Sequence, residues 1–177
     1  MANIRIGSPG TVPDTPLDST ATCNDVEYSN KGTWLSNLPI DTSCSPHDAY
    51  GEYLEVDFKE LELVEGIKLQ GFSNKCLCES PNRFSSNPDQ FSIEYHDGCQ
   101  WYTTSNAGLT WKPAKEVTDN LRSKFSGPAS FGEVSHLNAF SPFLAKKVRV
   151  IFVEYSGEYL GARLGIDVHE RGQCVKW

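Results

Sequence analysis

The sequence has none of the long apolar runs that membrane spans need. Nowhere do about 18 apolar residues follow one another, and the opening MANIRIGSPG holds no apolar core of signal-peptide length. The sequence also has no Asn-X-Ser/Thr sequon, so it gives no sign of N-glycosylation. The absence of a long apolar run argues against a membrane-spanning segment, and the absence of a sequon gives no support to a secreted location. If the protein is secreted, we expect its leader to lie outside this sequence.

The common catalytic motifs are absent as well. The chain contains no G-x-S-x-G elbow, no H-E-x-x-H pair, no phosphate-binding loop and no G-x-G-x-x-G turn. The paired carboxylates Glu60 and Glu62 fall on the polar side of a predicted strand, where solubility and protection of a sheet edge explain them. We therefore predict that the protein is not an enzyme.

No stretch of the chain concentrates positive charge. Lys and Arg total 16 against 23 Asp and Glu, which gives a net charge of -7. A chain with this charge repels phosphate-rich partners on average. Nucleic acid and an anionic membrane surface are therefore disfavoured as partners.

What the sequence does contain indicates one loop-rich globular domain. Its 177 residues include 14 Gly, 10 Pro and 38% hydrophobic residues, a composition that folds and can bury a sizeable core. We expect a single domain over 1–177, in which residues 1–22 form a first strand and a long loop, or partly a linker. The six cysteines favour an oxidising compartment, so we expect a secreted or cell-surface protein.

Five segments alternate apolar and polar residues with a period of two, which is the pattern of half-buried strands. They are 52–58, 67–70, 91–96, 146–155 and 162–169. The residues expected to share one apolar face in each are Leu54, Val56, Phe58, Ile67, Leu69, Phe91, Ile93, Tyr95, Val148, Val150, Phe152, Leu164, Ile166 and Val168. Segment 114–125 has room for a short helix. Short strands joined by long polar loops predict an all-β fold, an antiparallel β-sandwich or jelly roll.

The order of these segments resembles the discoidin family, the type C domains of coagulation factors V and VIII. The similar pieces are GTW at Trp34, EYLEVDF, VEGIKLQGF, FSIEYHDGCQW, the long stretch KFSGPASFGEVSHLNAFSPFLAKKVRVIFVEYSG, and GARLGIDVH with Arg163. Together they cover 32–169 in the order that the family has. The resemblance implies a galactose-binding-like jelly roll whose long loops gather at one end.

The family uses that end for recognition, so the resemblance implies a binding site formed by loops 9–22, 36–51, 73–90 and 155–161. Aromatic and polar side chains in these loops suit either a sugar or a protein ligand. Trp34 and Arg163 flank the core in the family and are expected to be structural. The ligand-binding residues that we predict are Asn37, Asp41, His47, Asp48, Tyr50, Asn74, Arg83, Phe84, Tyr155, Glu158 and Tyr159.

The function implied is a non-catalytic recognition or adhesion module for a cell-surface or matrix protein or a glycan. The alternative is a lectin-like carbohydrate-binding module of a larger enzyme or toxin. Binding to anionic phospholipids is less favoured, because the first loop holds Asp14 and Asp18 and no aromatic residue. No cofactor is expected other than a structural calcium ion of the kind that similar sugar modules hold. Its candidate ligands are Asp41, Asp48 and Asp89.

The cysteines are assigned to disulfides on the layout that the resemblance implies. Cys99 and Cys174 would lie at the end away from the recognition loops, and we predict that they are bonded. Cys76 and Cys78 would each pair with one of Cys23 and Cys44 and join the loops. The rival is the family's end-closing bond, here Cys23 with Cys174. Zinc held by Cys76, Cys78, His96 and Cys99 is disfavoured, because Cys-x-Cys is not the usual chelating gap.

Overall fold

The computed structural model describes residues 3–6, 34–35, 46–73, 85–105, 110–129, 133–157 and 160–169. Its strands are β1 (Asn3–Ile6), β2 (Trp34–Leu35), β3 (His47–Asp48), β4 (Tyr53–Gln70), β5 (Phe72–Ser73), β6 (Ser85–His96), β7 (Trp101–Thr104), β8 (Trp111–Pro113), β9 (Phe125–Ser126), β10 (Val134–Leu137), β11 (Phe143–Gly157) and β12 (Gly161–Val168). In place of the short helix expected in 114–125 there are two 3₁₀ turns, η1 (Ala114–Glu116) and η2 (Asp119–Leu121). No helix within the described ranges is long and apolar enough to cross a membrane.

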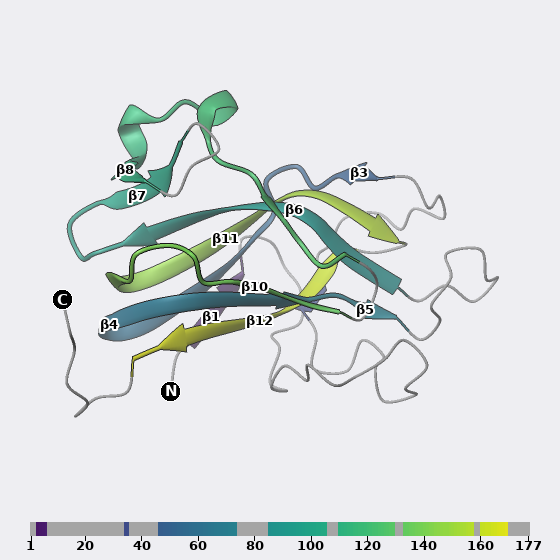
Figure 1. The fold of residues 1–177 in the computed structure, drawn as a ribbon, viewed down its shortest axis with the longest axis horizontal. Helices are drawn as coiled ribbons and strands as arrows, with labels where there is room; N and C mark the ends of the chain where they lie inside the picture. The colour runs from purple at the N-terminus through teal and green to yellow at the C-terminus, as the bar shows by residue number, and fades with distance from the viewer. Residues whose placement is uncertain are drawn as a thin grey trace.

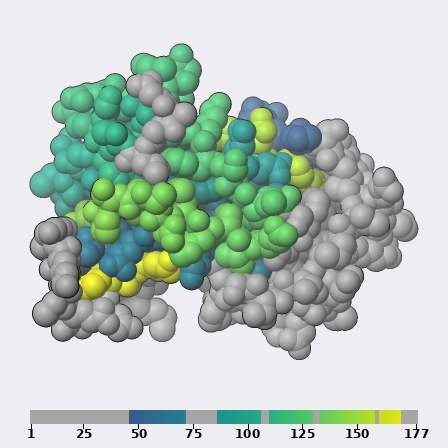
Figure 2. Space-filling model, viewed as in Figure 1, coloured from purple at the N-terminus to yellow at the C-terminus, as the bar shows by residue number. Residues whose placement is uncertain are grey.

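All paired strands are antiparallel, as the sequence predicted for a sandwich. The strand order is β2-β12-β4-β11-β6-β7-β8. Figure 1 shows the sheet curled on itself, with β6 and β11 on one side and β4, β10 and β12 on the other. In the same view, Figure 2 shows the green segment that contains β10 lying over the blue of β4, its partner strand.

Strand β4 joins the two sides of the sandwich in one continuous run of 18 residues. The sequence pattern predicted two strands here, separated by an acidic interval. In the structure that interval is a bulge: Ala145 of β11 lies opposite Glu62, whereas Lys147 lies opposite Asp57. Lys59, inside the bulge, has a φ of 66°, and its N–H donates to the Asp57 carboxylate at 3.0 Å. Such a bulge bends a strand, which lets β4 pair first with β1 and then with β12.

The predicted inward-facing residues form the core. Leu54, Val56, Ile67, Leu69, Phe91, Ile93, Val148, Val150 and Phe152 are all buried. Phe58, Tyr95, Leu164 and Ile166 pack against this cluster and are partly buried. Val168 is the exception, because it is the last residue of β12 and 39% of it remains exposed.

The polar face of β4 is not solvated where the sequence pattern predicted that it would be. Glu55 is only 7% exposed. Arg149 of β11 lies opposite both Glu55 of β4 and Glu94 of β6, and its guanidinium is 2.8 Å from the Glu55 carboxylate. The Arg149 Cζ also lies 4.3 Å from the ring centres of Tyr53 and Trp101. Aromatic rings and a buried ion pair therefore cover this part of the outer face.

Candidate functional site

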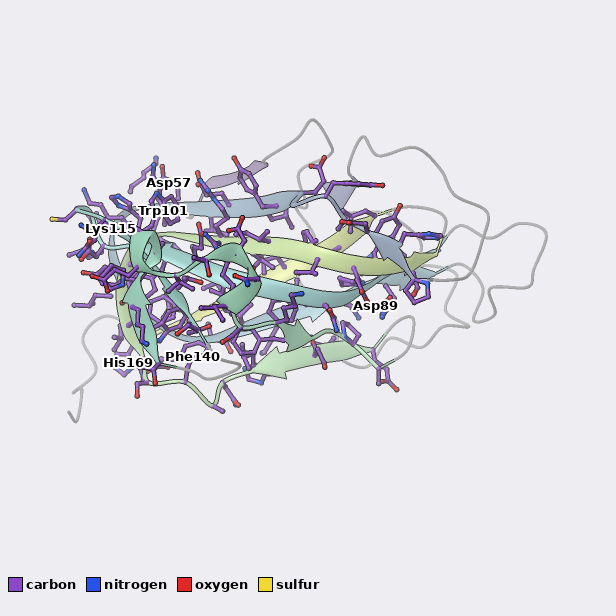
Figure 3. The ribbon with its side chains drawn as sticks, turned by 90° about the horizontal axis from the view of Figure 1, so that it is seen from above. Asp57, Asp89, Trp101, Lys115, Phe140 and His169 are labelled. Atoms are coloured by element: carbon purple, nitrogen blue, oxygen red, sulfur yellow. The ribbon has the colours of Figure 1, made fainter. Side chains whose placement is uncertain are left out.

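The two ends of the sandwich differ in the residues that they present. We call the loop end the one that carries β3, the first residues of β6 and the last residues of β11. Figure 3 shows Asp89 towards this end, and Trp101, Lys115 and His169 at the opposite one. The predicted ligand-binding residues that the structure describes, His47, Asp48, Tyr50 and Tyr155, belong to β3, to the turn after it and to β11.

Strand β3 brings His47, Asp48 and Tyr155 together, since it pairs with β11 in the register Glu154 to Asp48 and Tyr155 to His47. The His47 and Tyr155 rings are 5.2 Å apart, tilted by 53°. Tyr155 is only 4% exposed and belongs to the core cluster. Its ring therefore supports His47 from beneath and does not offer an open face to a ligand.

The turn that follows β3 is held rigidly and exposes Tyr50. The Asp48 carboxylate accepts the Tyr50 N–H at 2.7 Å, and the Ala49 N–H donates to the Val153 carbonyl at 3.0 Å. Tyr50 has a φ of 52°, a conformation that costs free energy for any residue with a Cβ. Nevertheless its side chain is 78% exposed. Residues in such strained backbone conformations cluster at functional sites, so Tyr50 is a candidate for ligand contact.

The first residues of β6 and β12 are also joined to each other at the loop end. The Ser86 hydroxyl donates to the Gly161 carbonyl and accepts the Gly161 N–H, both at 2.9 Å, which ties the start of β6 to the start of β12. Arg163, expected to be structural, is buried. The other predicted ligand-binding residues lie outside the described residues; they are Asn37, Asp41, Asn74, Arg83, Phe84, Glu158 and Tyr159.

Two of the three candidate calcium ligands, Asp48 and Asp89, have carboxylates that already accept hydrogen bonds within the protein. Asp89 accepts from the Asn87 amide at 2.8 Å through Oδ1, and from the Ser156 hydroxyl through Oδ2. Asp48 accepts from Tyr50, as described above. No group of three or more His, Cys, Asp or Glu that could hold a metal ion is found among the described residues. Asp41 is outside them, so the calcium site stays a prediction.

Cys99 lies in the turn between β6 and β7, at the opposite end. The Asp97 carboxylate accepts the N–H groups of Cys99 and Gln100, at 2.8 and 3.0 Å, and these bonds hold the pKa of Asp97 below its usual value. Cys99 is exposed, and its thiol is free. Its predicted partner, Cys174, lies outside the described residues, so the bond between them stays a prediction. Cys23, Cys44, Cys76, Cys78 and Cys174 lie outside the described residues.

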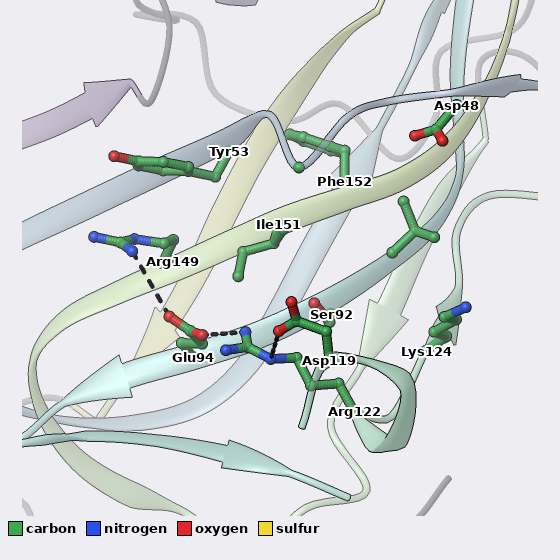
Figure 4. A pocket seen from close by; sticks show the side chains of 12 residues that line it. Asp48, Tyr53, Ser92, Glu94, Asp119, Arg122, Lys124, Arg149, Ile151 and Phe152 are labelled. Atoms are coloured by element: carbon green, nitrogen blue, oxygen red, sulfur yellow. Dashed lines mark hydrogen bonds and ion pairs between the residues drawn. The ribbon is translucent and has the colours of Figure 1, made fainter. Parts of the chain in front are cut away.

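Sequence reasoning missed a hollow of about 450 Å³ on the outer face of β4, β11 and β6. We call it the outer groove; its lining includes Asp48, Tyr53, Ser92, Arg122, Lys124 and Ile151. Figure 4 shows it running from Asp48 at the loop end to the segment after η2. No local sequence signal marks it, because its residues come from strands far apart in the chain.

An ion-pair network forms one wall of the outer groove. Glu94 is paired with Arg122 and lies 3.7 Å from the guanidinium of Arg149, and Arg122 lies 3.4 Å from Asp119. Figure 4 shows these three contacts as dashed lines. The side chains of Glu94, Arg122 and Arg149 are therefore fixed in position by one another.

A second hollow, of about 510 Å³, lies near the opposite end and is aromatic. The Tyr95 ring stacks on Tyr102 at 4.9 Å and on Phe143 at 4.2 Å, and Trp111 meets Tyr95 edge-on at 5.0 Å. Burial raises the pKa of Tyr95 to about 12, with Tyr102 and Asp97 adding to the shift. These rings pack against one another and against the core cluster, so we regard this hollow as the outer margin of the core.

Comparisons with known proteins identify the fold. No protein-family model and no curated protein matches the chain. Among solved structures, wild-type discoidin II from Dictyostelium discoideum superposes with a TM-score of 0.55 at 11% identity, over 94% of this chain and 54% of that one. The chain thus spans about half the length of discoidin II.

Two bacterial structures have TM-scores of 0.50. The family 32 CBM from C. perfringens NanJ, solved in complex with galactose, is 14% identical over 93% of this chain and 92% of that one. The structure of the CBM32-1, CBM32-2 and M60 catalytic domains of Clostridium perfringens ZmpB is 13% identical over 90% of this chain and 13% of that one. The chain therefore has the discoidin-type fold that its sequence resembles.

Proposed function

We propose that the chain is a non-catalytic recognition module that binds a glycan at its loop end. The observation that supports this most directly is the exposure of Tyr50 on a rigid turn. An aromatic ring stacks on the apolar face of a sugar, while neighbouring polar groups bind its hydroxyls. His47 and the Asp48 carboxylate stand beside Tyr50 and are suited to the second role.

The fold supports a glycan over a protein as the ligand. The NanJ module that shares this fold was solved with galactose bound. The absence of catalytic motifs in the sequence and the occurrence of this fold in carbohydrate-binding modules both support a non-catalytic role. A secreted or cell-surface location is supported by the six cysteines.

A second candidate is a carbohydrate-binding module within a larger enzyme. It is supported by ZmpB, where domains with this fold stand in one chain with an M60 catalytic domain. The two candidates share the same binding chemistry and differ in the protein around the module.

A glycan array probed with the recombinant chain tests the proposal. We expect binding to one class of sugars, which Tyr50→Ala weakens about tenfold or more because the stacking surface is lost. Leu144→Ala is the control, because Leu144 is exposed on β11 outside the loop end. Binding to no sugar on the array would contradict the proposal and favour a protein partner.

A further inference from the structure

We propose that the outer groove is a second ligand site and that its ligand is a neutral saccharide. The groove is formed by strands β4, β6 and β11 and by the segment after η2, and it shares Asp48 of β3 with the proposed loop-end site, which centres on Tyr50. Its volume of about 450 Å³ lies within the range of about 300 to 1,000 Å³ that small-molecule sites have. The inference does not rest on the proposed function.

Ser92 is the first indication of a ligand. It lies in β6 opposite Ile151 of β11, lines the groove and is only 4% exposed. Figure 4 shows the Ser92 side chain at the groove. Its hydroxyl can donate a hydrogen bond to a ligand hydroxyl and accept one from it.

The charges that line the groove select a neutral ligand. Asp48, Glu94 and Asp119 balance Arg122, Lys124 and Arg149, so the lining has no net charge. Glu94 is already paired with two of the cations. The chain as a whole has a net charge of -7, which disfavours an anion further.

The groove-lining groups outside the ion-pair network are of the kinds that recognise a polyol. The Lys124 ammonium has no ion-pair partner among the described residues and can donate. The Asp48 Oδ2 can accept, beside the Oδ1 that accepts the Tyr50 N–H, and the Ser92 hydroxyl can do both. Ile151 supplies an apolar surface, and the Tyr53 ring is fixed against Arg149. Hydrogen-bonding groups of both kinds around apolar and aromatic surfaces match a sugar, which presents hydroxyls and C–H faces.

Protein-observed NMR tests the inference, with the methyl glycosides of galactose and glucose as neutral probes and glucuronate and glucosamine as charged ones. At least one neutral probe is expected to shift the backbone amide signals of Ser92, Lys124 and Ile151 in a saturable way. Ser92→Val and Lys124→Ala should each weaken that binding about three- to tenfold, since each removes a hydrogen-bonding group. Lys115→Ala is the matched control, because Lys115 is exposed and outside the groove.

The Tyr50→Ala variant distinguishes binding in the outer groove from binding at the loop end. Shifts in the groove that persist in Tyr50→Ala support the second site even if loop-end binding is absent. Loss of the groove shifts in Tyr50→Ala would overturn it, because the signals would then report the loop end. Tighter binding of glucuronate or glucosamine than of the neutral probes, or no shift at Ser92, Lys124 and Ile151 with any probe, would overturn it as well.

Discussion

Arg149 and Glu55 form a shielded ion pair across strands β11 and β4, with the Arg149 Nη2 2.8 Å from the Glu55 Oε1. Removal of Glu55 takes away the closer of the two carboxylates beside Arg149 and leaves only Glu94, at 3.7 Å. We therefore expect Glu55→Ala to lower the free energy of unfolding by about 3 kcal/mol, at the low end for a buried pair because Arg149 remains partly in solvent. Urea denaturation measures this, with Glu133→Ala as the control, because Glu133 is exposed. If Glu55→Ala costs no more stability than the control, Glu55 is solvated, as the sequence pattern predicted.

Val56 tests the register of the same strand. Its side chain is 3% exposed in the core, so Val56→Ala should destabilise the fold by about 1 to 3 kcal/mol through lost burial and a residual cavity. Leu61→Ala, in the bulge of β4 and about half exposed, should cost much less. Equal losses in the two thermal melts would mean that this part of β4 is displaced by one residue.

Tyr50 separates binding from stability. Its positive φ is strained for any residue with a Cβ, so Tyr50→Gly should be more stable than Tyr50→Ala by about 1 kcal/mol. Both variants should lose glycan binding alike, because both lack the ring. Chemical denaturation and the glycan array measure the two effects. A glycine variant less stable than the alanine variant would show that the turn has a different conformation.

Tyr95 should make stability depend on alkaline pH. Its pKa is raised to about 12 in the folded state, whereas a tyrosine in the unfolded chain ionises near 10. Between these two pH values the unfolded chain loses the Tyr95 proton while the folded chain keeps it, so ionisation favours unfolding. The contribution of the neutral Tyr95 to stability is therefore complete below about pH 10 and is lost as the pH rises towards 12. Tyrosinate absorbance should show one late-titrating group that Tyr95→Phe removes. A titration of Tyr95→Phe identical to that of the parent chain would contradict the assignment.

The exposed thiol of Cys99 should react with a maleimide in the folded protein. Peptide mapping by mass spectrometry under non-reducing conditions shows whether the label is on Cys99. Cys99→Ser should lose that label and keep the stability of the parent chain, since the side chain lies in an exposed turn. Recovery of a Cys99 to Cys174 linked peptide would instead support the disulfide that the resemblance implied.

Local patterns in the sequence were sufficient for the long strands β4, β6, β11 and β12 and for the core residues that they carry. Val148, Val150 and Phe152 are buried because alternate residues of a strand point to one face, and this depends on no other part of the chain. The order of such strands led to the fold. Among the predicted site residues, His47, Asp48 and Tyr50 do lie at the loop end, because a loop's place follows from the strands that it joins.

The tertiary structure alone decided what the polar positions do. Glu55 alternates with apolar neighbours like any solvated residue, yet it is buried, because the register of β4, β11 and β6 places Arg149 opposite two carboxylates. The same register forms the outer groove and places Ser92 in its lining. Tyr155 was expected to meet a ligand and packs in the core, because β11 shifts its register next to it. Alternation within a strand is local, so the sequence determines it; pairing between distant strands depends on the free energy of the whole sheet, so only the folded chain determines which polar groups meet.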